Sequence, residues 1–302
     1  MSQSRPTEEA LERSGEVATV SVDRAELAYV EAGEGEAVVF VHGALGDYRT
    51  WIPQVEAFST GFRAISYSRR SHFPDIYDET RHPYTQERHA DDLIAVLERL
   101  DAGPAHLVGH AYGGAVAALA AARRPDLVCD LVLAEPSLFA FADRPEAADA
   151  LGVMRADFDE VLESLDRRDV PAALEAYLNA VRGKGVPGDV PDAARRMFVD
   201  NVRTLRPMIE TLFEPPFGRA EARDLRPRTL FIVGELSLPL YRQIAEGFRN
   251  SGRRNARIVT LPCASHGLHL ERPAAFSALA LAFIAEGPGA STRAQCARLR
   301  DA

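Results

Sequence analysis

Apolar residues along this chain fall into two kinds of pattern, short continuous runs and longer stretches with helical spacing. The run Ala37–Val41 (AVVFV) is apolar at every position, which is typical of a strand buried on both faces. Short β-type segments, not all of them fully apolar, predict further strands at Ala18–Val22, Ala25–Val30, Phe62–Tyr67, Ala105–Gly109, Cys129–Ala134, Arg228–Val233 and Ala256–Leu261.

Helical spacing fills most segments between these strands. A helix is predicted up to about Leu100, because apolar residues recur at i, i+3, i+4 and i+7 from Leu93. Thr85 is suited to cap the N-terminus of this helix. From Ala37 onward strands and helices alternate, which predicts an α/β protein with a mainly parallel sheet covered by helices. The other helices of this alternation are expected over Tyr48–Phe58, Tyr112–Arg123, Tyr241–Asn250 and Leu268–Ala285.

The alternation stops between about residues 139 and 224, where the pattern is helical throughout. Apolar stripes over 158–165 and 174–181 are followed by a third predicted helix over about 197–213. A helical insertion in a parallel sheet indicates a cap over the carboxyl ends of the strands, where open α/β sheets bind ligands. We therefore expect a helical cap (139–224) inserted after the sixth strand of a core (17–138 and 225–286), with flexible tails (1–16 and 287–302).

Composition and charge exclude several classes of function. The chain has 302 residues, 46% of them hydrophobic, which is enough for one substantial core. A formal net charge of −9 makes nucleic acid and anionic membrane poor partners. No segment approaches the run of about 18 apolar residues that a transmembrane helix needs, and the N-terminal segment lacks the apolar stretch of a secretory signal. Three widely spaced cysteines suggest neither a disulfide framework nor a metal site and fit a cytoplasmic setting.

The segment that carries chemistry is residues 109–114, which read Gly-His-Ala-Tyr-Gly-Gly. They lie directly between a predicted strand and a predicted helix, as does the G-x-S-x-G nucleophile elbow, here with Ala111 at the serine position. The elbow needs small residues because its backbone is strained and approaches its neighbours closely; Gly109, Gly113 and Gly114 supply them. We interpret the segment as a nucleophile elbow that lacks its nucleophile.

On this motif, and on the His-Gly-Ala-Leu-Gly loop at 42–46 after the AVVFV strand, the chain resembles the α/β-hydrolase superfamily from about residue 17 to residue 286. It is most similar to the capped members related to haloalkane dehalogenases, haloperoxidases and serine hydrolases. The resemblance implies that the backbone N–H groups of Ala44 and Tyr112 form an oxyanion hole, which stabilises charge developing on a substrate oxygen. Because these are backbone groups, alanine at position 111 need not remove them.

The resemblance also points to a catalytic histidine. The family places it in the loop after the last strand, which maps to His266 in the segment 262–273. His269 follows three residues later, a spacing that resembles a metal site. No carboxylate or thiol cluster completes such a site, so we expect no metal and no cofactor.

The acid of the family's triad has two candidate positions. Its usual place after the next-to-last strand is occupied by Ser237, in the segment Gly-Glu-Leu-Ser that also contains Glu235. Some members place the acid at the end of the strand that follows the elbow helix, where this chain has Glu135. We prefer Glu135 to Glu235, because an acid there can orient the His266 ring and stabilise its charged form.

Three residues are candidates for substrate binding. The loop at 68–74 reads Ser-Arg-Arg-Ser-His-Phe-Pro, and its Arg69 and His72 could bind an anionic or oxygen-rich substrate. Equally, they could be structural donors to backbone carbonyls. Trp51 could line a pocket, although aromatic residues so placed are more often part of the core.

A methyl group cannot attack a carbonyl, so covalent serine catalysis is impossible with Ala111, whether that alanine is engineered or natural. The leading hypothesis is a parent hydrolase of small-molecule esters, lactones or similar acyl substrates with a Ser-His-Glu triad. The first alternative is a non-hydrolytic cyclase or lyase that uses His266, Glu135 and the oxyanion hole. The second is a catalytically dead ligand-binding protein. The expected partner is a small-molecule substrate, and we expect neither nucleic acid nor a membrane as a partner. The sequence is compatible with a homo-oligomer.

Overall fold

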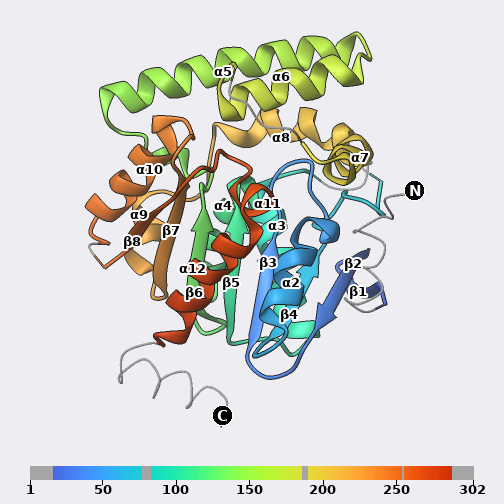
Figure 1. The fold of residues 1–302 in the computed structure, drawn as a ribbon, viewed down its shortest axis with the longest axis vertical. Helices are drawn as coiled ribbons and strands as arrows, with labels where there is room; N and C mark the ends of the chain where they lie inside the picture. The colour runs from blue at the N-terminus through green and yellow to red at the C-terminus, as the bar shows by residue number, and fades with distance from the viewer. Residues whose placement is uncertain (1–15, 77–82, 186–189, 254, 288–302) are drawn as a thin grey trace.

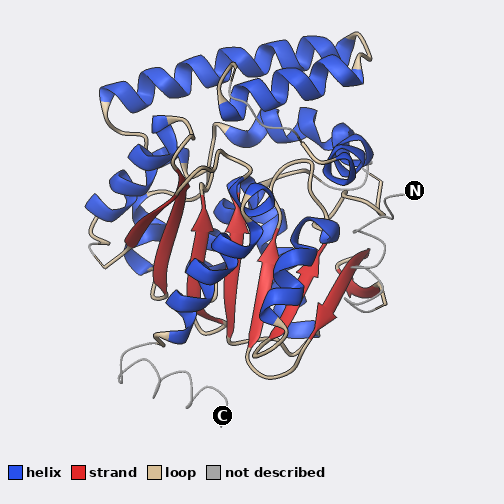
Figure 2. Cartoon of the chain, in the orientation of Figure 1, coloured by secondary structure: helices blue, strands red, loops and turns tan. Residues whose placement is uncertain are grey.

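Eight strands form one sheet, in which every pairing except the two made by β2 is parallel (Figures 1 and 2). The computed structural model describes residues 16–76, 83–185, 190–253 and 255–287. The strand order is β1-β2-β4-β3-β5-β6-β7-β8. The strands are β1 (Ala18–Val22), β2 (Ala25–Ala32), β3 (Ala37–Val41), β4 (Arg63–Tyr67), β5 (Ala105–His110), β6 (Val128–Ala134), β7 (Arg228–Gly234) and β8 (Arg257–Leu261).

The central strands β3, β5 and β6 are buried along their whole length, because helices cover both faces of the sheet. On one face, the apolar core includes side chains of α3 (Gln86–Arg99), α4 (Ala111–Arg123) and α10 (Pro239–Asn250). On the other face, a second core includes side chains of α2 (Ile52–Phe58) and α12 (Pro273–Ala285). The predicted mainly parallel sheet with helices on its two faces is confirmed.

Three predicted helices are each divided in the structure. The first, 48–58, begins as the 3-10 helix η1 (Tyr48–Trp51) before α2. The last, 268–285, is interrupted before Pro273, because a residue that precedes proline is disfavoured in helical geometry. Within the expected helix over 197–213, Pro207 has no backbone N–H, so it cannot donate the hydrogen bond that an uninterrupted helix would need at this position. That segment is divided into α7 (Asp192–Asn201), η3 (Val202–Thr204) and α8 (Leu205–Leu212).

Between β6 and β7, the described residues contain helices and no strand, and we call 139–224 the cap. Its two long helices, α5 (Pro145–Asp166) and α6 (Val170–Arg182), run side by side across the carboxyl-end edge of the sheet (Figure 1). The remaining cap elements are η2 (Phe139–Phe141), α7, η3, α8 and α9 (Arg219–Asp224). The predicted tails lie almost entirely outside the described residues.

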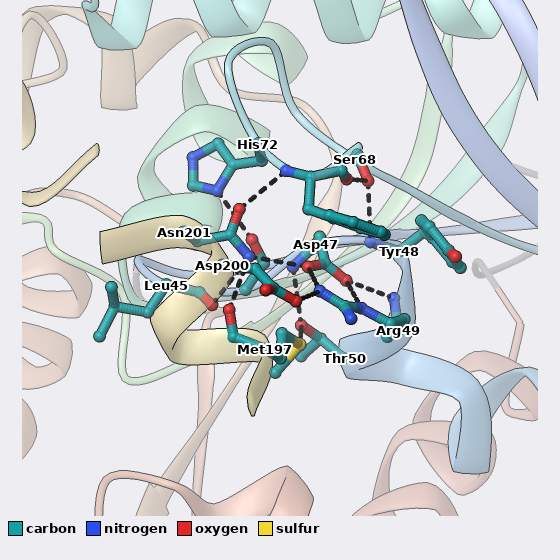
Figure 3. Close-up of polar contacts among 12 residues, drawn as sticks. Leu45, Asp47, Tyr48, Arg49, Thr50, Ser68, His72, Met197, Asp200 and Asn201 are labelled. Atoms are coloured by element: carbon teal, nitrogen blue, oxygen red, sulfur yellow. Dashed lines mark hydrogen bonds and ion pairs between the residues drawn. The ribbon is translucent and has the colours of Figure 1, made fainter. Parts of the chain in front are cut away.

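A polar network around Asn201, at the end of α7, ties the cap to the core (Figure 3). Its Nδ2 donates to the Leu45 carbonyl at 3.3 Å and to Asp47 Oδ2 at 2.7 Å. The Arg49 guanidinium bridges Asp47 and Asp200, with its Nη2 at 2.6 Å and 2.8 Å from their carboxylates. The network therefore fixes α7 against the loop that follows β3.

Replacing Asn201 by alanine is expected to lower the free energy of unfolding by about 3 kcal/mol. The variant would leave the fully buried Asp47 carboxylate short of a donor and the Phe73 N–H, now bonded to Asn201 Oδ1 at 2.8 Å, without its acceptor. Urea titration measures the change. The exposed Asn250→Ala serves as the control and should shift it by less than about 0.5 kcal/mol. Equal effects of the two substitutions would contradict this account of the network.

Candidate active site

The turn from β5 into α4 has the backbone of a strained elbow. Ala111 occupies the left-handed region, with φ +47°. The glycines around it are enforced by close contacts. A Cβ on Gly113 would lie 2.3 Å from the carbonyl oxygens of Val41 and His42, and one on Gly109 would lie 2.7 Å from Gly114 Cα. The glycine pattern in the sequence thus corresponds to a real steric requirement.

A Gly113→Ala substitution is expected to destabilise the fold by more than about 3 kcal/mol, because two backbone carbonyls would have to move. The matched control is Gly152→Ala, on an exposed part of α5 where an added Cβ meets no atom within 4 Å. That substitution should stabilise the protein by about 0.5–1 kcal/mol, because alanine favours a helix interior over glycine. Thermal unfolding of both variants measures the difference, and similar midpoints would refute the steric argument.

Glu135 and His266 meet beneath the cap. Glu135 directly follows β6, and its Oε2 lies 2.7 Å from Nδ1 of His266, within the predicted hydrogen-bond distance. Its other oxygen accepts a hydrogen bond from the Gly234 N–H at 2.7 Å. The alternative acid, Glu235, is exposed and accepts instead from the Cys263 N–H at 2.9 Å. The geometry therefore pairs His266 with Glu135.

Burial dominates the electrostatics of this pair. It raises the pKa of Glu135 to about 7, against the opposing effects of the Ser237 hydroxyl and the Gly234 N–H. The Ser237 Oγ makes no hydrogen bond of good geometry, so the Gly234 N–H is the main hydrogen-bond donor that opposes this rise. Burial, with the nearby charge of Arg182, lowers the pKa of His266 to about 3. His266 is thus neutral at pH 7 and, with Nδ1–H donated to Glu135, carries its lone pair on Nε2, as a general base requires.

Two further groups hold His266 in place, and sequence reasoning missed both. The Tyr241 ring stacks on the His266 ring, with centroids 4.5 Å apart, and its hydroxyl donates to the Val181 carbonyl of α6 at 3.0 Å. His110 donates from Nε2 to the His266 carbonyl at 2.8 Å. The position of His110 beside Ala111 was a usable signal, whereas Tyr241 looks like any apolar position of α10.

Two cavities meet at His266. We call the first the elbow cavity and the second the distal cavity. Ala44, Tyr177, Val181 and His266 line both. The elbow cavity is further lined by Ala111, Tyr112, Ser137, Phe139, Met154, Phe158, Met208, Leu212 and Tyr241. The distal cavity is further lined by Gly43, Gly46, Thr50, His110, Leu178, Arg182, Met197, Phe198, Gly267, His269 and Leu270.

Ala44 and Tyr112, the residues assigned to the oxyanion hole, both line the elbow cavity. Tyr112 is the second residue of α4, so its N–H has no partner within the helix. The loop that contains Ala44 is held by Arg69, which donates to the carbonyls of His42 and Gly43, each at 3.1 Å. The cavity wall thus combines Ala111, His266 and two candidate oxyanion donors.

The sequence profile of the alpha/beta hydrolase family matches residues 38–279. The chain belongs to this family. It is 28% identical over 254 residues to a 2-(acetamidomethylene)succinate hydrolase of Mesorhizobium japonicum, a match that covers 82% of this chain and 87% of that protein. It is 28% identical over 201 residues to a strigolactone esterase of Pisum sativum, covering 65% of this chain and 71% of that one. The carboxylesterase CesB of Bacillus subtilis has a similar fold, with a TM-score of 0.72 at 19% identity over 93% of this chain and 96% of the other. Relatives named as hydrolases and esterases make this chain a hydrolase-type member of the family.

In this alpha/beta hydrolase, the three substrate-binding candidates are not part of either cavity wall, which corrects the sequence-based assignment. Arg69 is 1% exposed, and its guanidinium is used by backbone carbonyls. His72 donates from Nδ1 to the Gly46 carbonyl at 2.7 Å. Trp51 is fully buried, with its ring 5.3 Å from that of Phe40. Arg69 and His72 are structural donors to backbone carbonyls, and Trp51 is part of the core. These are the alternative interpretations that the sequence left open for the three residues.

The described residues were compared with the arrangements typical of metal sites and membrane spans. Within it, no group of three or more His, Cys, Asp and Glu side chains is arranged to hold a metal ion. His269, whose spacing from His266 resembles a metal motif, packs instead on the ring of His110 at 4.3 Å. None of the helices in the described segments is long and apolar enough to cross a membrane.

Proposed function

We propose that this protein has the machinery of a hydrolase for small esters, lactones or similar acyl compounds, with position 111 as the nucleophile position. His266 is the general base, and Glu135 orients it. The observation that carries the proposal is that the elbow, the base and both candidate oxyanion donors line one cavity under the cap. Relatives named as a hydrolase and an esterase support acyl cleavage as the reaction class.

With a serine at position 111, each group would have a defined step. His266 Nε2 takes the hydroxyl proton while the oxygen attacks the acyl carbon. The N–H groups of Ala44 and Tyr112 donate hydrogen bonds to the oxyanion that forms. His266 then returns the proton to the leaving alkoxide, and the same sequence with water releases the acid. With Ala111, the first step has no nucleophile, and His266 can act only on a proton of water or of a bound ligand.

Assays of the Ala111 protein test the reaction class. Our proposal expects no hydrolysis of activated esters or lactones above the level of the His266→Ala variant. Turnover that His266→Ala or Glu135→Ala abolishes would instead favour a non-hydrolytic or water-activating enzyme. A ligand bound without turnover, and insensitive to both substitutions, would favour a binding protein. Either result would displace the hydrolase proposal for the chain as it stands.

A further inference from the structure

The wall of the elbow cavity contains two hydroxyl groups that the protein itself does not use. Among the described residues of this wall, those with a nitrogen or oxygen atom in the side chain are Tyr112, Ser137, Tyr177, Tyr241 and His266. The Tyr241 hydroxyl donates to a backbone carbonyl of α6, and His266 bonds to Glu135 through Nδ1. The Tyr112 hydroxyl is fully buried, with its ring packed against a core tyrosine and a core histidine. The Ser137 and Tyr177 hydroxyls therefore remain for a ligand.

Ser137 lies beside the nucleophile position. It is the second residue after Glu135, and its backbone N–H donates to the Ala111 carbonyl at 3.0 Å. The residue is 7% exposed, and its hydroxyl has no hydrogen-bond partner in the described part of the chain. A serine side chain is short, so its hydroxyl stays close to its own backbone and hence to Ala111. A substrate oxygen bound by Ser137 must therefore lie near the reacting carbonyl.

Tyr177 reaches the elbow cavity from the cap. It belongs to α6, is 7% exposed and stacks on the Phe158 ring, with centroids 6.1 Å apart. Within the described residues its hydroxyl also has no hydrogen-bond partner. Burial is the largest cause that raises the pKa of Tyr177, against the lowering effect of the charges of Arg182 and Arg69. The hydroxyl thus keeps its proton at neutral pH and can donate it to a hydrogen bond.

The elbow cavity suits a neutral ligand. None of the described residues in its wall has a charged side chain at pH 7, because burial lowers the pKa of His266 to about 3. A buried charge without a partner is costly, whereas two hydroxyl donors match the two lone pairs of one neutral oxygen.

We propose that the Ser137 and Tyr177 hydroxyls bind a neutral oxygen of the substrate next to its reacting carbonyl. Resting on the proposed function, this assigns the substrate class as acyl compounds with an ether, hydroxyl or keto oxygen near the acyl carbon, rather than plain alkyl esters. The unpartnered hydroxyls would then select the substrate, because a hydrocarbon chain in the same place would leave both of them unsatisfied.

Binding to the Ala111 protein tests this inference without any need for turnover. The probes are benzyl methoxyacetate and benzyl butyrate, which differ only in an ether oxygen that replaces one methylene group of the acyl chain. Calorimetry measures the affinity of each ester for the Ala111 protein and for its variants. Comparison between variants cancels the cost of removing the ether oxygen from water, because that cost is the same in each of them.

Tyr177→Phe and Ser137→Ala should each weaken binding of the methoxyacetate about fivefold, the factor of one neutral hydrogen bond, and change that of the butyrate by less than about twofold. The matched control is Tyr29→Phe, which removes a phenol hydroxyl from β2 outside both cavities and should leave both affinities unchanged. Retained binding of the butyrate also shows that each variant is folded.

A substitution that weakens both esters by the same factor would overturn the inference, because the effect would then not depend on the ether oxygen. Unchanged affinity for the methoxyacetate in both variants would overturn it too. The proposed function fails on a different result, the absence of a covalent product in the Ala111→Ser variant, so the two failures are distinguishable.

Discussion

Replacing Ala111 by serine is expected to raise the rate of hydrolysis of an activated ester by on the order of 10⁶, the factor typically lost when a catalytic serine is removed. The elbow backbone already holds residue 111 at φ +47°, and His266 already bonds to Glu135 at 2.7 Å. Under the proposed function, a hydroxyl placed there gains His266 as its base and the Ala44 and Tyr112 N–H groups as oxyanion donors, all in the wall of the elbow cavity. The initial rate with 4-nitrophenyl acetate measures the gain.

Double substitutions show whether that gain uses the proposed groups. Combined with His266→Ala, the Ala111→Ser variant should return to the background rate, because the hydroxyl loses its base. Combined with Glu135→Gln, it should lose a smaller but still large factor, because Glu135 acts only through the histidine. An Ala140→Ser variant, on the exposed surface of the cap, should show no gain. A gain that survives His266→Ala would contradict the assignment of the base.

Acidification below pH 6.5 is expected to lower the free energy of unfolding of the protein. Burial is the largest cause that lowers the pKa of six histidines, so they stay neutral in the folded state: His42, His72, His89, His110, His266 and His269. In the unfolded chain each binds a proton below about 6.5, so the unfolded state gains protons that the folded state refuses. Their contribution to stability is present above pH 6.5 and is lost as the pH falls.

The expected loss is large compared with the stability of a typical domain. Each histidine contributes about 1.4 kcal/mol per pH unit, against a typical free energy of unfolding of about 5–15 kcal/mol. Glu135, Asp92 and His106 oppose the loss, because their raised pKa values favour proton binding in the folded state. The net expectation is a loss of several kcal/mol between pH 6.5 and 5.5.

Urea titrations at pH 7.5, 6.5 and 5.5 measure this slope. Of the six rings, His269 is the one whose nitrogens have no partner in the protein, so His269→Phe should reduce the slope by about one proton without breaking a hydrogen bond. A free energy of unfolding that stays constant down to pH 5 would mean that the buried histidines take up protons while folded.

The strands and the elbow could be predicted from sequence because they depend on local rules. The continuous apolar run AVVFV placed β3 at Ala37–Val41, and a short β-type run placed β1 at Ala18–Val22, both with the observed bounds. The elbow was recognisable from its glycine pattern between a predicted strand and a predicted helix, although the contacts that require Gly113 come from the distant residues Val41 and His42. Glu135 was identified from a family pattern, and the geometry agrees with that choice over Glu235.

The rest of the site could not be predicted, because it depends on contacts between distant segments. Arg69 looked like a substrate ligand, but its charge is used by the carbonyls that shape the loop after β3. Arg182 of the cap and His269 of the short helix α11 (Leu268–Glu271) are 87 positions apart in the numbered sequence and share a cavity only after the cap has packed. Neither residue type nor spacing signals such a pair.

The most direct test of the central claim is the intact mass of the Ala111→Ser protein after incubation with a fluorophosphonate. The account predicts one covalent adduct per chain, located at position 111, no adduct on the Ala111 protein, and none when His266→Ala is added. A folded Ala111→Ser protein that gains no adduct would contradict it, because the elbow would then not present residue 111 to the histidine.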